Sequence, residues 1–172
     1  MTEAKTGTGR GPIAIRDAVP EDRPQLVRFM AALNAFERTL EPNRALGEAA
    51  ADRHVAYLQD LVAQQEGFVL IALGPEGPLG FLLAIVGEAA GSFVVPEARR
   101  YGYVTDLFVS ESARGRGVAR ALLAEAESRF RTRGLPSMRL SVLAANEAAR
   151  AAYRQLGFRP LDIEMIKPLD DS

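Results

Sequence analysis

The 172-residue sequence predicts an α/β fold in which helices cover both faces of one mixed β-sheet. Three observations predict it. Some segments repeat apolar residues at helical spacing, while others are short, continuously apolar and bounded by glycine or proline, as buried strands are. Two early strand candidates are joined by a short turn, which favours antiparallel pairing. A later strand–helix–strand order over 101–143 favours a parallel pair with a right-handed crossover.

The first half of the chain predicts one strand, two helices and a hairpin. Proline and two acids at 20–22 are typical of a helix start, because proline fits the first turn and acids favour the positive end of the helix dipole. In chain order we first expect a strand over 13–16 and a helix that starts at 20–22 and ends before Pro42. The apolar residues of this helix recur at helical spacing: Leu26, Phe29, Met30, Leu33 and Phe36. A second helix over 47–64 follows, and then two strands over 68–73 and 80–86 joined by a turn at 74–78.

The second half alternates strands and helices. Glycine follows each of two amphipathic segments, at Gly134 and Gly157, and marks their ends. We expect an irregular segment over 87–100 with a short β piece at 93–95, a strand over 101–109, a helix over 117–133, a strand over 138–143, a helix over 146–156, and strand character at 158–160 and 163–166.

Length and composition predict one domain over 12–172, preceded by a flexible tail over 1–11. Apolar residues make up 48% of the chain and charged residues 25%, which suits a globular protein with a sizeable core. The start of the chain lacks the apolar stretch of a signal peptide, and the most apolar run, 80–86, is far too short to cross a bilayer. We therefore expect a soluble cytoplasmic protein without a membrane partner.

Charge and residue types exclude several kinds of site. The net charge of −1 gives no basic field to attract nucleic acid. The chain has no cysteine, which excludes a thiolate nucleophile and cysteine-bound metals, and a single histidine, His54, excludes a multi-histidine metal site within one chain. No metal is expected. His54 lies beside an apolar helical face and is interpreted as a packed or surface residue.

The segment 104–123 indicates an anion site. An apolar strand enters a glycine-rich turn that opens a helix, and the unpaired N–H groups of a first helical turn favour phosphate or pyrophosphate. Three arginines, at 114, 116 and 120, add positive charge there. A dinucleotide motif fits poorly because Arg120 occupies the third glycine position, and the ending of a P-loop is missing. A tight turn without any ligand stays open at this point.

Two linked motifs carry a family resemblance, dense from 101 to 158 and thinner upstream. The first is Arg114-Gly-Arg-Gly117-Val-Ala119, and the second is Asn146-Glu-Ala-Ala149-Arg-Ala-Ala-Tyr153-Arg-Gln-Leu-Gly157-Phe158. They resemble the R/Q-x-x-G-x-G/A signature and the N-x-x-A-x-x-x-Y-x-x-x-G-F helix of the GNAT superfamily of acyl-CoA-dependent N-acyltransferases. The resemblance implies that family's fold, a mostly antiparallel sheet with a splayed parallel pair.

The resemblance also implies a site for acetyl-CoA as cosubstrate. Loop N–H groups would hold its pyrophosphate, the strand's main chain would pair with its pantetheine arm, and an N–H near Phe108 or Val109 would polarise the thioester carbonyl. A bulge in the strand would part it from the strand over 138–143. The implied binding residues are Leu107, Phe108, Val109, Arg114, Gly115, Arg116, Gly117, Val118, Ala119, Arg120 and Asn146.

Tyr153 is implied as the general acid that protonates the departing thiolate. A phenol has a pKa near 10, which matches an alkyl thiol. Helical spacing puts Asn146 and Tyr153 on one face of their helix. The competing interpretation is that Tyr153 only packs.

The general base is less defined. Relatives that modify small amines often carry Glu-Asp before Leu-Phe-Val, whereas this chain has Thr105-Asp106. Strand alternation puts Tyr103, Thr105 and Leu107 on one face and Asp106 on the other. Asp106 acting through a bulge, a water oriented by Tyr103 and Thr105, and no enzymatic base at all remain open.

The expected activity is transfer of an acetyl group from acetyl-CoA to a primary amine of a small molecule or protein, by direct attack in a ternary complex. Acids at 37, 41, 48 and 52 would favour a cationic acceptor if they line its site. The alternative is a non-catalytic acyl-CoA-binding sensor, which the missing glutamate motivates. Since members of the family commonly pair, a homodimer is also expected.

Overall fold

The computed structural model describes residues 11–169, which fall into two compact units that meet in sequence between Ser141 and Val142. The first ten residues, which hold most of the expected tail, lie outside the described part. The first unit contains β1 (Ala14–Asp17), the 3₁₀ turn Pro20–Asp22, α1 (Arg23–Arg38), α2 (Glu48–Gln64), β2 (Phe68–Gly74), β3 (Gly77–Glu88), α3 (Pro96–Arg99), β4 (Arg100–Val109), the 3₁₀ turn Glu111–Ala113, α4 (Val118–Thr132) and β5 (Met138–Leu140). The second contains α5 (Glu147–Gln155).

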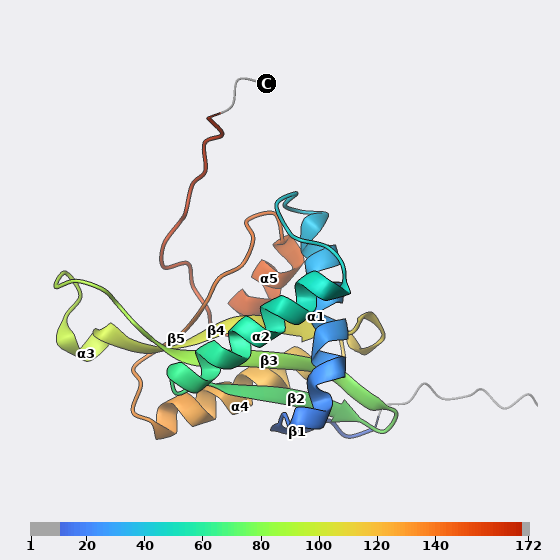
Figure 1. Cartoon of the computed structure of the whole chain (residues 1–172). Coiled ribbons are helices and arrows are strands. Elements are labelled where there is room, and N and C mark those ends of the chain that lie inside the picture. Colours follow the sequence, from blue (N-terminus) through green and yellow to red (C-terminus); the bar gives the residue numbers. More distant parts are fainter. Residues whose placement is uncertain (1–10, 170–172) are drawn as a thin grey trace, which may run out of the picture. The chain divides into compact units, whose positions relative to one another are not determined.

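The first unit is built on one five-stranded sheet in the order β1-β2-β3-β4-β5. The first three neighbouring pairs are antiparallel and the last, β4 with β5, is parallel. Figure 1 shows β2, β3 and β4 running side by side through the unit, with α4 as the connection between the parallel strands. The α/β class and the mixed sheet predicted from the sequence are confirmed.

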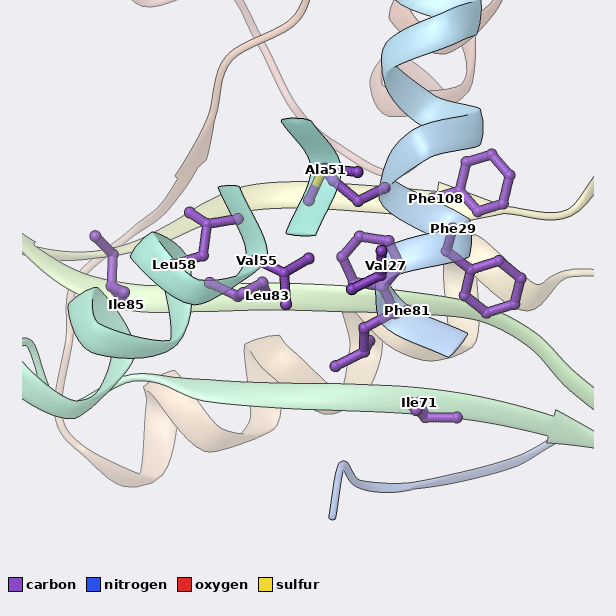
Figure 2. Packing of buried hydrophobic residues seen from close by; sticks show 12 residues of the cluster. Val27, Phe29, Ala51, Val55, Leu58, Ile71, Phe81, Leu83, Ile85 and Phe108 are labelled. Carbon is purple, nitrogen blue, oxygen red and sulfur yellow. The ribbon is translucent and has the colours of Figure 1, made fainter. Parts of the chain in front are cut away.

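Helices cover both faces of the sheet. On one face α1 and α2 pack over β2, β3 and β4, and their apolar side chains form a cluster in which Phe29 stacks on Phe81 at 6.2 Å between ring centroids (Figure 2). On the other face α4 packs against the same strands, with Phe130 beside Phe68 at 5.3 Å. Burial of these apolar surfaces holds the layers together.

The sheet is less extensive than the sequence predicts. β5 ends at Leu140 instead of reaching 143, and residues 158–169 contain no strand. Ile163 and Met165 there are 83% and 89% exposed. A strand forms only where a neighbour accepts its backbone hydrogen bonds, and in the described chain none pairs with this segment. The β piece expected at 93–95 is also wrong, because Pro96 begins α3 directly after it.

None of the helices within 11–169 has the length and apolar character needed to cross a membrane. The same residues hold no group of three or more histidine, aspartate or glutamate side chains that could bind a metal ion.

Candidate functional site

A bulge in β4 changes which side chains face α1 and α2. Leu83 of β3 is opposite Asp106, while the next residue, Ala84, is opposite Val104, so Thr105 is the extra residue. An extra residue reverses the alternation beyond it. Asp106 therefore joins Tyr103 on one face, which corrects the assignment to opposite faces. The Thr105 hydroxyl donates to the Leu83 carbonyl at 3.3 Å across the bulge.

Beyond this bulge β4 loses its parallel neighbour. β5 pairs with β4 only from Gly102 to Val104, whereas β4 continues to Val109. Residues 106–109 are thus paired with β3 on one side, and β5 offers them no partner on the other. Such an edge can accept an extended chain as an added strand. The Phe108 ring packs on Phe29 at 5.3 Å, so only its main chain can serve a ligand.

The loop after β4 is a glycine-containing turn that leads into the N-terminus of α4. Gly115 and Gly117 have φ of 72° and 84°, a backbone conformation that residues with a Cβ rarely adopt. A Cβ at either glycine would meet nothing within 4 Å, so the loop is open to a ligand. Ala121 makes the first α4 hydrogen bond, to the Gly117 carbonyl at 3.0 Å. The N–H groups of Val118, Ala119 and Arg120 therefore have no acceptor within the helix.

Three arginines surround this turn, and over residues 11–169 no carboxylate forms a salt bridge with any of them. Arg114 and Arg120 are exposed and Arg116 is half-buried. The Arg114 guanidinium lies 5.7 Å from the centre of the Phe36 ring, which holds it beside α1. Open glycines, unpaired helix N–H groups and unneutralised arginines together fit a diphosphate.

Asp106 faces a histidine that the sequence interpretation set aside. Nε2 of His54 on α2 lies 3.9 Å from Oδ1 of Asp106. The Asp106 side chain is 13% exposed and that of His54 is 42% exposed. This contact with Asp106 raises the pKa of His54; Glu37 adds a smaller effect in the same direction, while burial opposes both.

The contact could not be read from the sequence because the two residues are 52 positions apart and the bulge decides which way Asp106 points. A single histidine near the middle of a predicted helix was the only available signal, and such residues are usually structural. The water-orienting candidates have partners of their own: Tyr103 shares a hydrogen bond of 2.7 Å with Ser141, and Thr105 bonds the Leu83 carbonyl.

Two of the four acids that would favour a cationic acceptor are paired with arginines. Glu37 pairs with Arg44 at 2.8 Å and Asp52 pairs with Arg23 at 2.5 Å. These contacts neutralise two of the four carboxylates.

A cavity of about 500 Å³ opens where β4 begins, on the side of the bulge away from the glycine loop. Side chains from the end of α2 and from β3 and β4 line it, among them Gln64, Glu66, Arg100, Tyr101 and Tyr103. Glu66 and Arg100 form an ion pair of 2.5 Å there. Tyr103 connects this cavity to the face on which Asp106 lies.

The two remaining predicted site residues belong to the second unit. Asn146 caps α5, because its side-chain oxygen accepts a hydrogen bond from the Ala149 N–H at 3.1 Å. The ring of Tyr153 packs edge-to-face on Phe158 at 5.7 Å. Both observations fit the spacing of the motif, which places a cap at the start and an aromatic residue near the end of one short helix.

Comparisons with known proteins place the chain in one family. The Acetyltransferase (GNAT) family matches residues 30–158. The chain is 36% identical over 67 residues to the uncharacterized N-acetyltransferase YycN of Bacillus subtilis, covering 39% of this chain and 43% of that protein. It is 34% identical over 83 residues to an acetyltransferase of Sodalis glossinidius, covering 48% and 58%. The chain thus spans about half the length of these curated relatives.

Solved structures share the fold. A mutant of the BH1408 protein from Bacillus halodurans superposes with a TM-score of 0.74 at 20% identity, covering 91% of this chain and 99% of that chain. A GCN5-related N-acetyltransferase from Ralstonia eutropha superposes with a TM-score of 0.71 at 26% identity, covering 92% and 99%. Because the family match spans most of the sequence, the chain belongs to the acetyltransferase (GNAT) family, whose general chemistry is acetyl transfer.

Proposed function

We propose that residues 12–172 act as a single N-acetyltransferase domain, which moves the acetyl group of acetyl-CoA to a primary amine of a small molecule or protein by direct attack in a ternary complex. One observation carries the proposal: β4 loses its parallel neighbour after Val104 and then enters an open glycine turn at the N-terminus of α4. An extended thioester arm ending in a diphosphate needs this combination. The chain has no cysteine to carry an acyl intermediate, which supports direct attack.

The loop and strand divide the binding of acetyl-CoA between them. The N–H groups of 115–120 and the nearby arginines hold the diphosphate, and the main chain of Leu107 to Val109 pairs with the pantetheine arm. A backbone N–H at Phe108 or Val109 polarises the thioester carbonyl. In this proposal Asn146 contacts the coenzyme. Asp106 helps to remove the proton of the amine, and Tyr153 protonates the leaving thiolate. The motif resemblance supports the roles of Asn146 and Tyr153.

In this proposal acetyl-CoA lies on the side of the bulge that leads to the glycine loop. The amine enters from the other side, through the cavity at the start of β4. The cavity supports this direction because it shares Tyr103 with the face of Asp106. We further propose that the protein works in the cytoplasm and pairs as a homodimer, as members of its family commonly do.

Calorimetry tests the coenzyme site with two matched variants. Gly117 and Gly134 stand at opposite ends of α4, with φ of 84° and 71°, and a Cβ on either meets nothing within 4 Å. Alanine at either position costs similar backbone strain, about 1–2 kcal/mol, because both positions have the left-handed conformation. In Gly117→Ala the added Cβ enters the open space in which the diphosphate is proposed to lie. We expect acetyl-CoA binding to weaken at least about tenfold, because the loss of one charge-assisted hydrogen bond costs about 1.5–3 kcal/mol. Gly134→Ala should bind as the wild type does.

Thiol release from acetyl-CoA with a panel of primary amines tests turnover. Amine-dependent release supports the enzyme, whereas tight binding without release from any amine supports the acyl-CoA sensor instead. An absence of acetyl-CoA binding to the wild type contradicts both.

A further inference from the structure

The pairing of His54 with Asp106 joins two elements at the bulge. The imidazole projects from α2 and the carboxylate from β4, and 3.9 Å separates their nearest nitrogen and oxygen atoms. That distance exceeds a direct hydrogen bond. Catalytic hydrogen bonds are often long before substrate binds and shorten in the complex. The carboxylate is mostly covered, while the imidazole remains open to solvent.

The surroundings of His54 favour a charged imidazole. Asp106 approaches it from β4, and Glu37 acts at longer range from α1, where Arg44 holds Glu37 at 2.8 Å. On its own helix, the ring of Tyr57 stacks at 6.1 Å between centroids. Strands β2 and β3 present apolar side chains of the buried cluster toward α2, namely Ile71, Leu83 and Ile85.

We propose that His54 accepts the proton lost by the acceptor ammonium, and that Asp106 positions the imidazole and stabilises its charged form. This inference rests on the proposed acetyl transfer and names the base for it. Asp106 is then a positioning residue, and the glutamate found in many relatives that modify small amines is replaced by a residue from another element.

The proton and electron balance of the step is simple. The ammonium gives one proton to the imidazole, and the freed lone pair forms the C–N bond to the acyl carbon while the C–S bond breaks. The nitrogen loses a second proton as the amide forms, and the leaving thiolate gains one. The imidazolium then releases its proton to water, so one proton is released per turnover.

Imidazole suits this task better than the carboxylate alone. An ordinary aspartate has a pKa near 3.9, whereas a primary ammonium resembles lysine at about 10.4. The ordinary pKa values of a carboxylic acid and a primary ammonium thus differ by more than six units, and this mismatch makes a carboxylate in general a poor acceptor for the ammonium proton. The ordinary pKa of histidine is about 6.5, and Asp106 raises that of His54, which narrows the mismatch.

One histidine in the whole sequence makes a direct measurement simple. In the full chain, purified without a histidine tag, the imidazole proton signals in an NMR titration belong to His54. We expect Asp106→Asn to lower the pKa of His54 and Glu37→Gln to lower it less. Asp60→Asn, on the exposed side of the same helix, should leave it unchanged. An unchanged pKa in Asp106→Asn overturns the coupling.

The pH dependence of amine acetylation gives the second measurement. We expect the acid limb of kcat/KM to move to lower pH in Asp106→Asn, by the shift seen in the NMR titration. The amine's own titration is common to all variants, so the difference between them isolates the enzyme group. His54→Gln should lose this limb and slow kcat by about 10²–10⁴-fold, with little change in KM for acetyl-CoA.

The outcomes separate this inference from the proposed function. Turnover by the wild type together with an unchanged rate and limb in His54→Gln overturns the role of His54 alone. If the wild type binds acetyl-CoA but acetylates no amine, the proposed function fails and this inference fails with it. Circular dichroism shows whether His54→Gln folds. If it does not, the pH profile of Asp106→Asn tests the inference: an acid limb of kcat/KM that moves to lower pH supports it, and an unmoved limb overturns it.

Discussion

Thr105 adds one residue to β4 and so determines the direction of every side chain after it. Tyr103 before the bulge and Phe108 after it both pack on the cluster under α1 and α2, although an unbroken strand would put them on opposite faces. Asp106 reaches His54 for the same reason. At this scale a backbone irregularity, rather than the identity of a side chain, brings two titratable groups together.

Tyr153 provides a prediction at the same scale. Replacing it with phenylalanine should keep the ring contact with Phe158 and remove only the hydroxyl. If this hydroxyl protonates the thiolate, kcat for acetyl transfer should fall by about 10²-fold or more. The affinity for acetyl-CoA should stay near the wild-type value. Steady-state kinetics across pH checks the expectation, and an unchanged rate at every pH contradicts the role of Tyr153.

An ion pair joins the first strand to the helix on the far face of the sheet. Two nitrogens of Arg129 on α4 contact the two carboxylate oxygens of Asp17 on β1 at 2.5 Å and 3.0 Å. Arg129 also lies over the ring of Phe68, 5.1 Å from its centre. The hydrogen bonds from Arg129 lower the pKa of Asp17. Through these contacts the edge strand is tied to α4 as well as to β2.

We predict a small pH-dependent loss of stability in Asp17→Asn. The Asp17 side chain is 64% exposed, so solvent screens the pair and its contribution is about 0.5 kcal/mol at pH 7. Because the folded-state pKa is lowered, the contribution is present above the unfolded value near 3.9 and disappears as pH falls through the folded value. Urea unfolding of both proteins from pH 7 downward should show their difference shrinking. Asp60→Asn, the same substitution at an exposed helix position, is the control for the loss of one negative charge.

At the scale of the whole sheet, the face that carries the candidate base also holds a large cluster of buried apolar side chains. Phe81 is 2% exposed and lies among the side chains of α1, α2 and β4, with Phe29 stacked on it. The same cluster holds Phe108, two residues beyond Asp106. Packing of this face therefore fixes both the stability of the sheet and the position of the site on it.

Truncation of that core should destabilise the protein strongly. We predict that Phe81→Ala costs about 3–5 kcal/mol, which lowers the melting temperature by roughly 6–20 °C in a chain of this size. The same change at Phe93, which is 87% exposed, should cost less than about 0.5 kcal/mol. Differential scanning calorimetry compares the two, and equal losses would contradict the assignment of the core.

Local patterns in the sequence determined most of the architecture. Apolar spacing and glycine or proline breaks located α1, α2, α4, α5 and the first four strands to within a few residues. The loop at 115–120 was predictable because its glycines and the following helix form a short, contiguous signal. Each of these features depends on residues close in the chain, so the sequence could specify it directly.

Tertiary structure decided the features that depend on distant partners. Residues 158–166 have the composition of strands, yet no described neighbour pairs with them, and β5 stops at Leu140. His54 and Asp106 become neighbours only because α2 lies over a bulged β4. Strand pairing and contacts between a helix and a sheet are made by segments far apart in sequence. The spacing of residues within one segment does not indicate which distant segment will lie beside it.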